Sequence, residues 1–200
     1  SDYLCAHEYA EAQISECNLI EPGFNLYQML YIKLSLQIKY LIDKGLLSDN
    51  VCTRKYPQQL ATLCYNRAIM HVRQNELILE QLVKQYRLGI VAQSYGNLPA
   101  MLVDFGLTPY FTDVIESSAV NLNKPDQAIF KLSVDALHIA PEETLCVSNS
   151  LNNDLLPAQG IGCQTAWLNL RPVPPAKRVS NYHITSLTDL NALLYSKSNT

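Results

Sequence analysis

The spacing of hydrophobic positions changes near residue 87. Before this point, nearly every segment has the spacing of a helix. From Phe24 to Ile42, leucine and isoleucine residues recur every three or four positions, which predicts a long helix that is apolar on most of its faces. Gly45 is placed to end it. Two further helices are predicted at Tyr56–Val72 and Glu76–Tyr86, and no strand is predicted before residue 88.

After residue 87, short apolar segments alternate with segments of helical spacing. The predicted strands are 88–93, 113–117, 145–149, 163–169 and 182–184. The predicted helices are 98–105, 126–138, a short one through Leu155 and Ala158, and 187–194. Residues 171–178 carry three prolines and are predicted to form an extended connection. Alternation of strands and helices is typical of βα units on a parallel sheet.

Ligands of such sheets bind at the carboxyl ends of the strands, so the residues directly after each strand are the candidates for a site. They are Gln93, Ser94, Ser117, Ser118, Asn149, Ser150 and Asn169.

Composition narrows the class of protein. Apolar residues make up 48% of the 200 residues, which is enough for a packed core. The net charge is −3 without a basic run, so nucleic acid is not the expected partner. No charge-free apolar stretch reaches about 18 residues, so no membrane span is predicted. The N-terminus lacks the pattern of a signal peptide, and the six cysteines match no zinc spacing. These features favour reduced thiols in a cytoplasmic protein.

Lys124 is the most informative single residue. It stands in Asn123-Lys124-Pro125-Asp126, where Pro125 marks the predicted first position of a helix. Backbone N–H groups at a helix N-terminus attract anions, and the lysine ammonium would converge on the same ligand. The alternative, a solvated loop lysine, is equally compatible with the sequence alone.

Polar residues come after two of the predicted strands. Ser94, beside Gln93, could donate a hydrogen bond to a phosphate oxygen, whereas a nucleophilic role for Ser94 is disfavoured. Asn149 and Ser150 come after the third strand, and Asp154 lies one helical turn further on. A single carboxylate among amides makes a weak magnesium site. The favoured alternative is that Asp154 caps its helix or braces the loop.

The segments RLGIVAQSYGN, DVIESS, NKPDQAIF and APEETLCVSNSLNNDLLPAQGIGCQTAWLN, taken in this order, resemble the haloacid dehalogenase (HAD) superfamily in its phosphatase-like branch with a helical cap. The resemblance covers roughly residues 75–195. It implies a Rossmann-like parallel-sheet core at residues 83–200 and an all-helical cap at residues 1–82. It also implies covalent phosphoryl transfer, with an aspartate nucleophile from a DxDxT motif, a Ser or Thr that binds phosphate, a lysine, and acids that hold Mg²⁺.

Several of these motifs are altered in this chain. No DxDxT is present, and the resemblance places that strand before the first residue. Ala92 and Gln93 stand where a Ser or Thr followed by Asn is expected, and Asn149 stands where the first magnesium-binding acid is expected. Lys124 and the later acid, Asp154, are retained. These departures imply a catalytically inactive member that needs no cofactor and holds a small phosphorylated ligand or another anion.

Two alternatives stay open beside this interpretation. The chain could be an active Mg²⁺-dependent phosphatase of a small phosphorylated metabolite whose first strand is missing from the sequence. The apolar N-terminal helices could also form a homo-oligomer. In the resembled fold the first strand is central, so its absence leaves two interior strand edges unpaired. We expect the flanking strands to pair directly, or the gap to be filled by an N-terminal segment or a partner chain.

Overall fold

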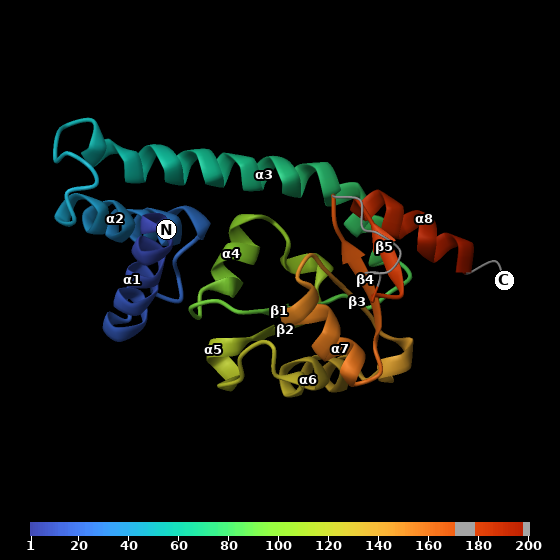
Figure 1. The fold of residues 1–200 in the computed structure, drawn as a ribbon. Coiled ribbons are helices and arrows are strands. Elements are labelled where there is room, and N and C mark those ends of the chain that lie inside the picture. The colour runs from blue at the N-terminus through green and yellow to red at the C-terminus, as the bar shows by residue number, and fades with distance from the viewer. Residues whose placement is uncertain (171–178, 198–200) are drawn as a thin grey trace. The chain divides into compact units, whose positions relative to one another are not determined.

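The computed structural model describes residues 1–170 and 179–197, and its elements form two compact units (Figure 1). The first unit comprises Ser1–Gln74 and Tyr95–Thr108, and the second comprises Asn75–Ser94 and Pro109 onward. The predicted extended segment at 171–178 lies outside the described residues. Within the described ranges, no helix combines the length and apolar character that a membrane crossing requires.

The first unit is helical. It contains α1 (Asp2–Cys17), α2 (Leu26–Asp43), a 3-10 turn at Thr53–Lys55, the first part of α3 (Tyr56–Leu82) and α4 (Leu98–Asp104). Helix α1 packs on α2 and buries Ala6, Ala10 and Ile14, which recur every four residues and so lie on one face. The small alanine side chains allow the two helices to approach closely.

A polar cluster joins α1 to α2. The Tyr95 hydroxyl donates to the Glu11 carboxylate at 2.7 Å, and the Lys33 ammonium pairs with the same carboxylate. Burial by itself would raise the pKa of Glu11, but the hydrogen bonds from Lys33 and Tyr95 outweigh it, so the Glu11 pKa is lowered. The charged pair therefore contributes stability at neutral pH and loses it as the pH falls below the ordinary Glu value of 4.5.

Helix α3 corrects one prediction. Two helices were predicted, at 56–72 and 76–86, but Tyr56–Leu82 is a single continuous helix. The intervening residues, Arg73, Gln74 and Asn75, include neither glycine nor proline, so nothing interrupts the helical hydrogen bonds. The predicted ending of α2 is confirmed, since Gly45 comes after it at φ 71° and donates to the Ile42 carbonyl.

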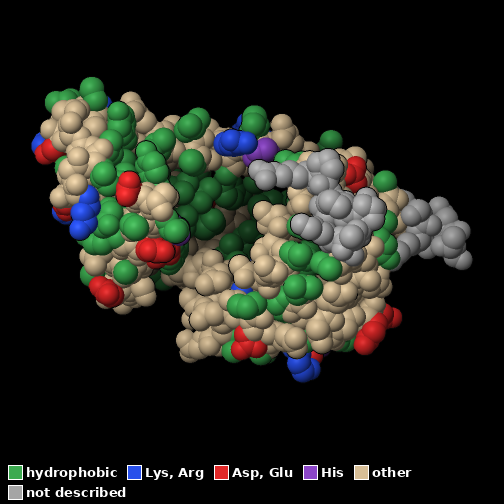
Figure 2. Space-filling model, in the orientation of Figure 1, with side chains coloured by type: hydrophobic (Ala, Val, Ile, Leu, Met, Phe, Trp, Pro, Cys, Tyr) green, Lys and Arg blue, Asp and Glu red, His purple; other side chains and the backbone are tan. Residues whose placement is uncertain are grey.

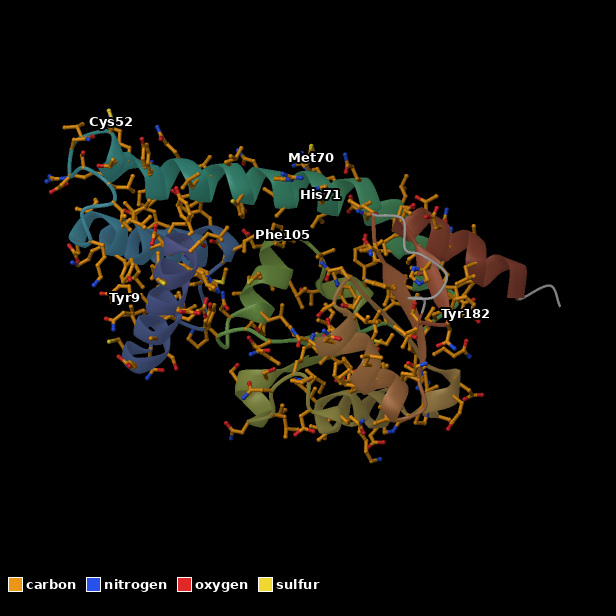
Figure 3. All side chains as sticks on the ribbon, viewed as in Figure 1. Tyr9, Cys52, Met70, His71, Phe105 and Tyr182 are labelled. Carbon is orange, nitrogen blue, oxygen red and sulfur yellow. The ribbon has the colours of Figure 1, made fainter. Side chains whose placement is uncertain are left out.

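Aromatic rings and exposed apolar side chains also mark the first unit. Tyr65 of α3 stacks on Phe105, the residue after α4, with ring centroids 5.9 Å apart (Figure 3). Hydrophobic side chains also reach the surface over these helices (Figure 2). Leu63 is 65% exposed and Met70 is 50% exposed. The oligomerisation expected for the N-terminal helices stays a prediction.

The second unit is a parallel α/β structure, as predicted. Its strands are β1 (Gly89–Ala92), β2 (Asp113–Glu116), β3 (Leu145–Ser148), β4 (Gln164–Leu168) and β5 (Tyr182–Ile184). Its helices are α5 (Ser117–Val120), α6 (Gln127–Leu137), α7 (Leu156–Gly160) and α8 (Leu187–Lys197), with the last turns of α3. Shorter turns are 3-10 at Thr108–Tyr110 and Pro141–Glu143, and π-helical at Leu151–Leu155.

The strands form two sheets. One pairs β1 with β2, and the other has the order β3-β4-β5; every pair is parallel. In the described part of the chain, β1 and β3 do not pair, so the expected direct pairing of flanking strands is wrong. Residues 2–17 form α1, so an N-terminal strand from this region is also wrong.

Two apolar clusters cover the strands. One gathers Ile129, Phe130 and Val134 of α6 with Ala158 of α7 and Cys163. The other gathers Leu82 of α3, Leu190 of α8, Ala166 and Ile184. Alternate strand residues contribute to different clusters: Cys146 packs on the first, and Leu145 and Val147 pack on the second. This is the period-two alternation of a strand whose two faces are both buried.

The start of α2 gives a direct test of local structure. Asn25 Oδ1 accepts from the Gln28 backbone N–H at 3.1 Å, and Gln28 Oε1 accepts from the Asn25 N–H at 2.9 Å. We predict that Asn25→Ala lowers the free energy of unfolding by about 1 kcal/mol, because the Gln28 N–H loses its side-chain acceptor. Urea unfolding followed by circular dichroism measures the loss. Asn25→Asp, which keeps an acceptor, should lose less than half as much, and equal losses would contradict the capping role.

Candidate functional site

The strongest polar cluster of the second unit lies at the carboxyl end of β3. Lys124 Nζ is 2.8 Å from Asp154 Oδ1, and the two side chains are only 15% and 14% exposed. The Ser148 hydroxyl donates to Asp154 Oδ2 at 2.5 Å and accepts from the Ser150 N–H at 3.0 Å. Lys124, Asp154 and Ser148 are therefore held in one arrangement by the strand end and the π-helical turn after it.

The start of α6 differs from the prediction. Pro125 was expected at the first helical position, but the helix begins at Gln127 with Asp126 as its N-cap. The Asp126 side chain accepts from the Ala128 N–H at 2.9 Å, so an aspartate already caps this helix start. The prediction that Lys124 stands directly before the first helical residue is therefore wrong. Asp154, 30 residues further along the chain, is the group that balances its charge.

Burial shapes the surroundings of this ion pair. Lys124 Nζ lies 5.8 Å from the centroid of the Phe130 ring, within reach of a cation–π attraction. Burial, and to a smaller extent the negative charge of Asp154, raises the pKa of the Cys146 thiol to about 12. Because both side chains are largely shielded from water, the electrostatic attraction between Lys124 and Asp154 is stronger than it would be in water.

The predicted residue Ser94 belongs to a different cluster. Its hydroxyl donates to Oε1 of Glu116, a carboxylate that is only 6% exposed at the end of β2. The next residue, Ser117, donates through Oγ to the Ala92 carbonyl at 3.1 Å. Ser94 thus joins the ends of β1 and β2, and its hydroxyl is bound to a carboxylate rather than placed beside Lys124.

Three further candidates lie at or near the strand ends. Gln93 and Asn149 are exposed, and the Asn149 carbonyl accepts from Trp167 Nε1 at 3.2 Å. Ser150 is joined to Lys124 indirectly: its N–H binds Ser148, and its carbonyl accepts from the Asp154 N–H at 3.2 Å. Of the predicted site residues, Lys124, Asp154 and Ser150 are thus brought together in this way.

Two functional candidates were missed from the sequence, Ser148 and Glu116. Both are the last residues of apolar strands, and polar residues at that position face the ligand edge of a parallel sheet. That signal is present in the sequence, but the prediction used only the residues after each strand. Ser148 orients Asp154, and Glu116 adds a buried carboxylate that the prediction did not include.

The donor set does not match the requirements of Mg²⁺. Among residues 1–170 and 179–197, no group of three or more His, Cys, Asp or Glu side chains is arranged around one point. Asp154 already has contacts from an ammonium on one oxygen and a hydroxyl on the other. Magnesium prefers carboxylate or phosphate oxygens that carry uncompensated negative charge. These residues therefore do not fit Mg²⁺ by themselves.

A cavity of about 730 Å³ extends from the ion pair along the strands. Lys124, Ser148 and Asp154 line it, together with residues of β1, β3, α3, α6 and α8. Most of this lining is apolar, including Val91, Phe130 and Leu190. Its volume falls within the range of small-ligand pockets, about 300–1,000 Å³.

The ion pair leads to a prediction about stability. Lys124→Met should lower the free energy of unfolding by about 2–3 kcal/mol, because it leaves the Asp154 carboxylate buried without a counter-charge. Lys124→Met with Asp154→Asn should recover more than half of that loss. Lys131→Ala, in an exposed pair with Asp135, is the control and should cost less than about 0.5 kcal/mol. A double variant as unstable as Lys124→Met, measured by urea unfolding, would contradict the coupling.

The buried thiol gives a second prediction. At pH 8, iodoacetamide should modify the exposed cysteines, Cys5, Cys17, Cys52 and Cys64, and leave Cys146 unmodified, because its raised pKa keeps the thiolate scarce. Mass spectrometry of the peptides measures this, and the same reaction in urea is the control. Since an unfolded thiol ionises near 9.0, the contribution of Cys146 to stability is complete below pH 9 and falls between pH 9 and 12. Rapid labelling of Cys146 in the folded protein would contradict this description.

Several known proteins are similar to this chain in sequence. Curated relatives include phosphoserine phosphatase of Thermus thermophilus, 34% identical over 37% of this chain and 30% of its own. Putative HAD-hydrolase YfnB of Bacillus subtilis is 28% identical over 58% of this chain and 51% of its own. Glyceraldehyde 3-phosphate phosphatase of Methanocaldococcus jannaschii is 31% identical over 44% of this chain and 40% of its own. The chain thus spans about half or less of the length of these relatives.

Solved structures agree on the fold. A dehalogenase with an intermediate complex matches with a TM-score of 0.62, at 20% identity over 95% of this chain and 81% of its own. A HAD phosphatase from Thermococcus onnurineus matches with a TM-score of 0.56, at 22% identity over 96% of this chain and 88% of its own. The family model described as haloacid dehalogenase-like hydrolase matches residues 32–168, more than half of the chain. The chain therefore belongs to the haloacid dehalogenase-like hydrolase family.

Proposed function

We propose that this HAD-family chain retains an anion-binding remnant around Lys124 and does not catalyse phosphoryl transfer by itself. The observation that carries the proposal is the pairing of Asp154. Both of its oxygens are engaged, one by Lys124 at 2.8 Å and one by Ser148 at 2.5 Å. A carboxylate bound in this way is poorly placed to act as a metal ligand, a nucleophile or a base.

The ends of β1 and β3 support the same proposal. Ala92 offers a methyl group where the family pattern has a hydroxyl, and Asn149 offers an amide where the pattern has a carboxylate. At the neighbouring end of β2, the Glu116 carboxylate accepts from the Ser94 hydroxyl. Phosphoryl transfer needs an activated nucleophile and positive charge in excess, and the ion pair of Lys124 and Asp154 has no net charge.

An anion at this site would have to share Lys124 with Asp154. The Ser148 hydroxyl and the Ser150 N–H are further donors beside the pair, and both already serve the loop. Inorganic phosphate is therefore expected to bind weakly, with a dissociation constant on the order of 1 mM or more.

A second candidate is an active Mg²⁺-dependent phosphatase of a small phosphorylated metabolite. The observation in its favour is the cavity between β1 and β3, which resembles the position of the family's central first strand. Several curated relatives carry names of phosphatases that act on such metabolites, phosphoserine and glyceraldehyde 3-phosphate. On this proposal, activity requires a strand that the described residues do not supply.

Turnover distinguishes these two proposals. With 10-fold or greater excess of Mg²⁺, we expect the purified 200-residue protein to hydrolyse para-nitrophenyl phosphate no faster than buffer alone, because the nucleophile is lacking, Asn149 replaces the first metal-binding acid, and Asp154 is already paired. Absorbance of the released nitrophenolate measures the rate. Turnover that Lys124→Met abolishes and Lys131→Ala preserves would overturn the inactive proposal in favour of the phosphatase.

Phosphate binding is tested separately by thermal unfolding. Millimolar phosphate should raise the Tm of the wild-type protein and of Lys131→Ala, and should leave the Tm of Lys124→Met unchanged, because only the last variant lacks the ammonium. Equal concentrations of sodium chloride control for ionic strength. An equal phosphate response in all three proteins would contradict an anion site at Lys124.

A further inference from the structure

Helix α3 presents apolar side chains on two opposite sides within the first unit. The inward side is made of residues three or four positions apart that are buried or half-buried: Pro57, Ala61, Tyr65, Ala68 and Val72. Tyr65 shows what this side packs against. Its ring meets Tyr27 of α2 edge-on at 6.1 Å, and its hydroxyl donates to Asp104 Oδ2 of α4 at 2.8 Å. This side of α3 therefore packs on the other helices of the unit.

The outward side carries a row of residues separated alternately by four and three positions: Tyr56, Leu60, Leu63, Arg67, Met70 and Gln74. This spacing keeps the row, here called the outer row, on one side of the helix, about 180° from Tyr65. Its four apolar members are 37% to 65% exposed. A helix that is apolar on opposite sides needs cover on both, so the exposed outer row marks an interaction surface.

The outer row has the pattern of a helix that pairs with another helix. Alternating intervals of four and three form the narrow seam of a coiled coil, not the wider stripe of a helix that faces a globular core. Beside Met70 (Figure 3), α3 has a hollow lined by Asn66, Ile69, Met70, Arg73 and Gln74. Four of these, at intervals i, i+3, i+4 and i+7, form the kind of hole that receives one side chain from a facing helix. The expected occupant is therefore another helix.

Charge decides how this second helix can run. Residues 51–75 include no Asp or Glu, and Arg67 stands in the outer row itself. Among the described residues, no ion pair involves Arg67 or Arg73. If a parallel copy of α3 packed on the outer row, each Arg67 would face the other Arg67, which is repulsive. A parallel pair of α3 helices is therefore disfavoured.

An antiparallel copy of α3 removes this conflict. The outer row is symmetrical about residue 65, so a twofold axis at that level pairs the row with itself. The facing pairs, one residue from each copy, are Tyr56 with Gln74, Leu60 with Met70, and Leu63 with Arg67. The aliphatic stem of Arg67 then covers Leu63 of the second copy while its guanidinium stays in water. The same surface is thus complementary to itself, as a twofold interface requires.

We propose that the outer row of α3 is a self-association surface, on which a second copy of this chain packs antiparallel to form a twofold dimer. The seam from Tyr56 to Gln74 is about 28 Å long at about 1.5 Å per residue. A contact of this length lies near the lower limit of stable interfaces, about 1,000 Å², so we expect a Kd on the order of 10 µM. The seam uses residues of the first unit and is independent of the anion site at Lys124.

Analytical ultracentrifugation of the intact 200-residue protein measures the dimer. We expect the sedimenting mass to rise from that of a 22.5 kDa monomer toward twice that value as the concentration passes through about 10 µM. Met70→Glu should raise the Kd about tenfold or more, because it buries a carboxylate opposite Leu60 of the second copy. Leu132→Glu, at an exposed leucine of α6, is the matched control and should leave the Kd unchanged.

Leu63→Glu distinguishes antiparallel from parallel pairing. In the antiparallel dimer the new carboxylate faces Arg67 of the second copy, so the Kd should stay within about threefold of the wild-type value. In a parallel dimer two carboxylates would face each other, and the Kd should rise as it does for Met70→Glu. Adding Arg67→Ala to Leu63→Glu removes the facing charge and should raise the Kd about tenfold.

Crosslinking at Cys64 gives an independent check of the same arrangement. Cys64 is exposed, directly follows Leu63, and in the antiparallel dimer faces Cys64 of the second copy across the axis. With the other exposed cysteines, Cys5, Cys17 and Cys52, replaced by serine, a short bis-maleimide should join two copies at a concentration above the Kd. Met70→Glu should abolish the crosslinked dimer on a denaturing gel, and Leu132→Glu should preserve it.

Several outcomes would overturn the proposal once circular dichroism shows that each variant is folded. They are a monomer even at about 1 mM, a dimer that Met70→Glu leaves intact, and a Leu63→Glu dimer as weak as that of Met70→Glu. A monomer that sediments with phosphatidylglycerol vesicles, and loses this binding in Met70→Glu, would assign the outer row to an anionic membrane surface instead of a second copy.

Discussion

Backbone hydrogen bonding at the edges of β1 and β3 is the constraint on which the second unit depends. Parallel strands are stable when both faces are covered and both edges are satisfied. The faces are covered here, since α6 and α7 pack on one apolar cluster and α3 and α8 pack on the other. The edges are satisfied on the β2 and β4 sides only, within the described residues. Apolar side chains thus surround a space whose two long borders are polar backbone.

The position of the ion pair results from the same arrangement. β3 ends at Ser148, and the π-helical turn after it brings Asp154 back against Ser148. Lys124 approaches the same carboxylate from the segment before α6 and lies over the Phe130 ring. The pair therefore lines the cavity with charge that is internally balanced. Removal of either partner leaves the other charge buried without a counter-charge. The stability of this region therefore depends on the presence of both partners.

The sequence predicted the strands well and their connections less well. Short apolar runs bounded by turn residues predicted all five strands within two residues of their observed ends, because burial on both faces leaves a strong local signal. The predicted division of α3 into two helices is wrong, because the polar residues 73–75 between them include none that disrupts a helix. No local pattern indicates that residues 95–108 belong with the first unit, since that grouping depends on contacts such as that of Asn97 with the Phe24 carbonyl.

The site was harder to predict than the fold, because its partners are distant in sequence. Lys124 and Asp154 were each identified, but their pairing depends on the folded loop after β3. Ser94 was assigned to phosphate by its place after β1, whereas the buried Glu116 takes its hydroxyl. The position of a residue after a strand correctly indicates the edge of the sheet where it lies. Which side chains it contacts there depends on the conformation of the loops, and that conformation has no simple sequence pattern.

Charge balance limits what the proposed anion site can bind. Lys124 and Asp154 sum to zero, so the described residues attract neither an anion nor a divalent cation strongly. The sign of any group that a ligand brings to this pair would decide the net charge of the site. A neutral group would leave Lys124 tied to Asp154. A carboxylate would compete for the ammonium and give the cluster a net negative charge, which is the condition that a divalent cation requires. The chemistry available at Lys124 thus depends on the charge of the group that binds beside it, because the residues that now surround the lysine leave the site neutral.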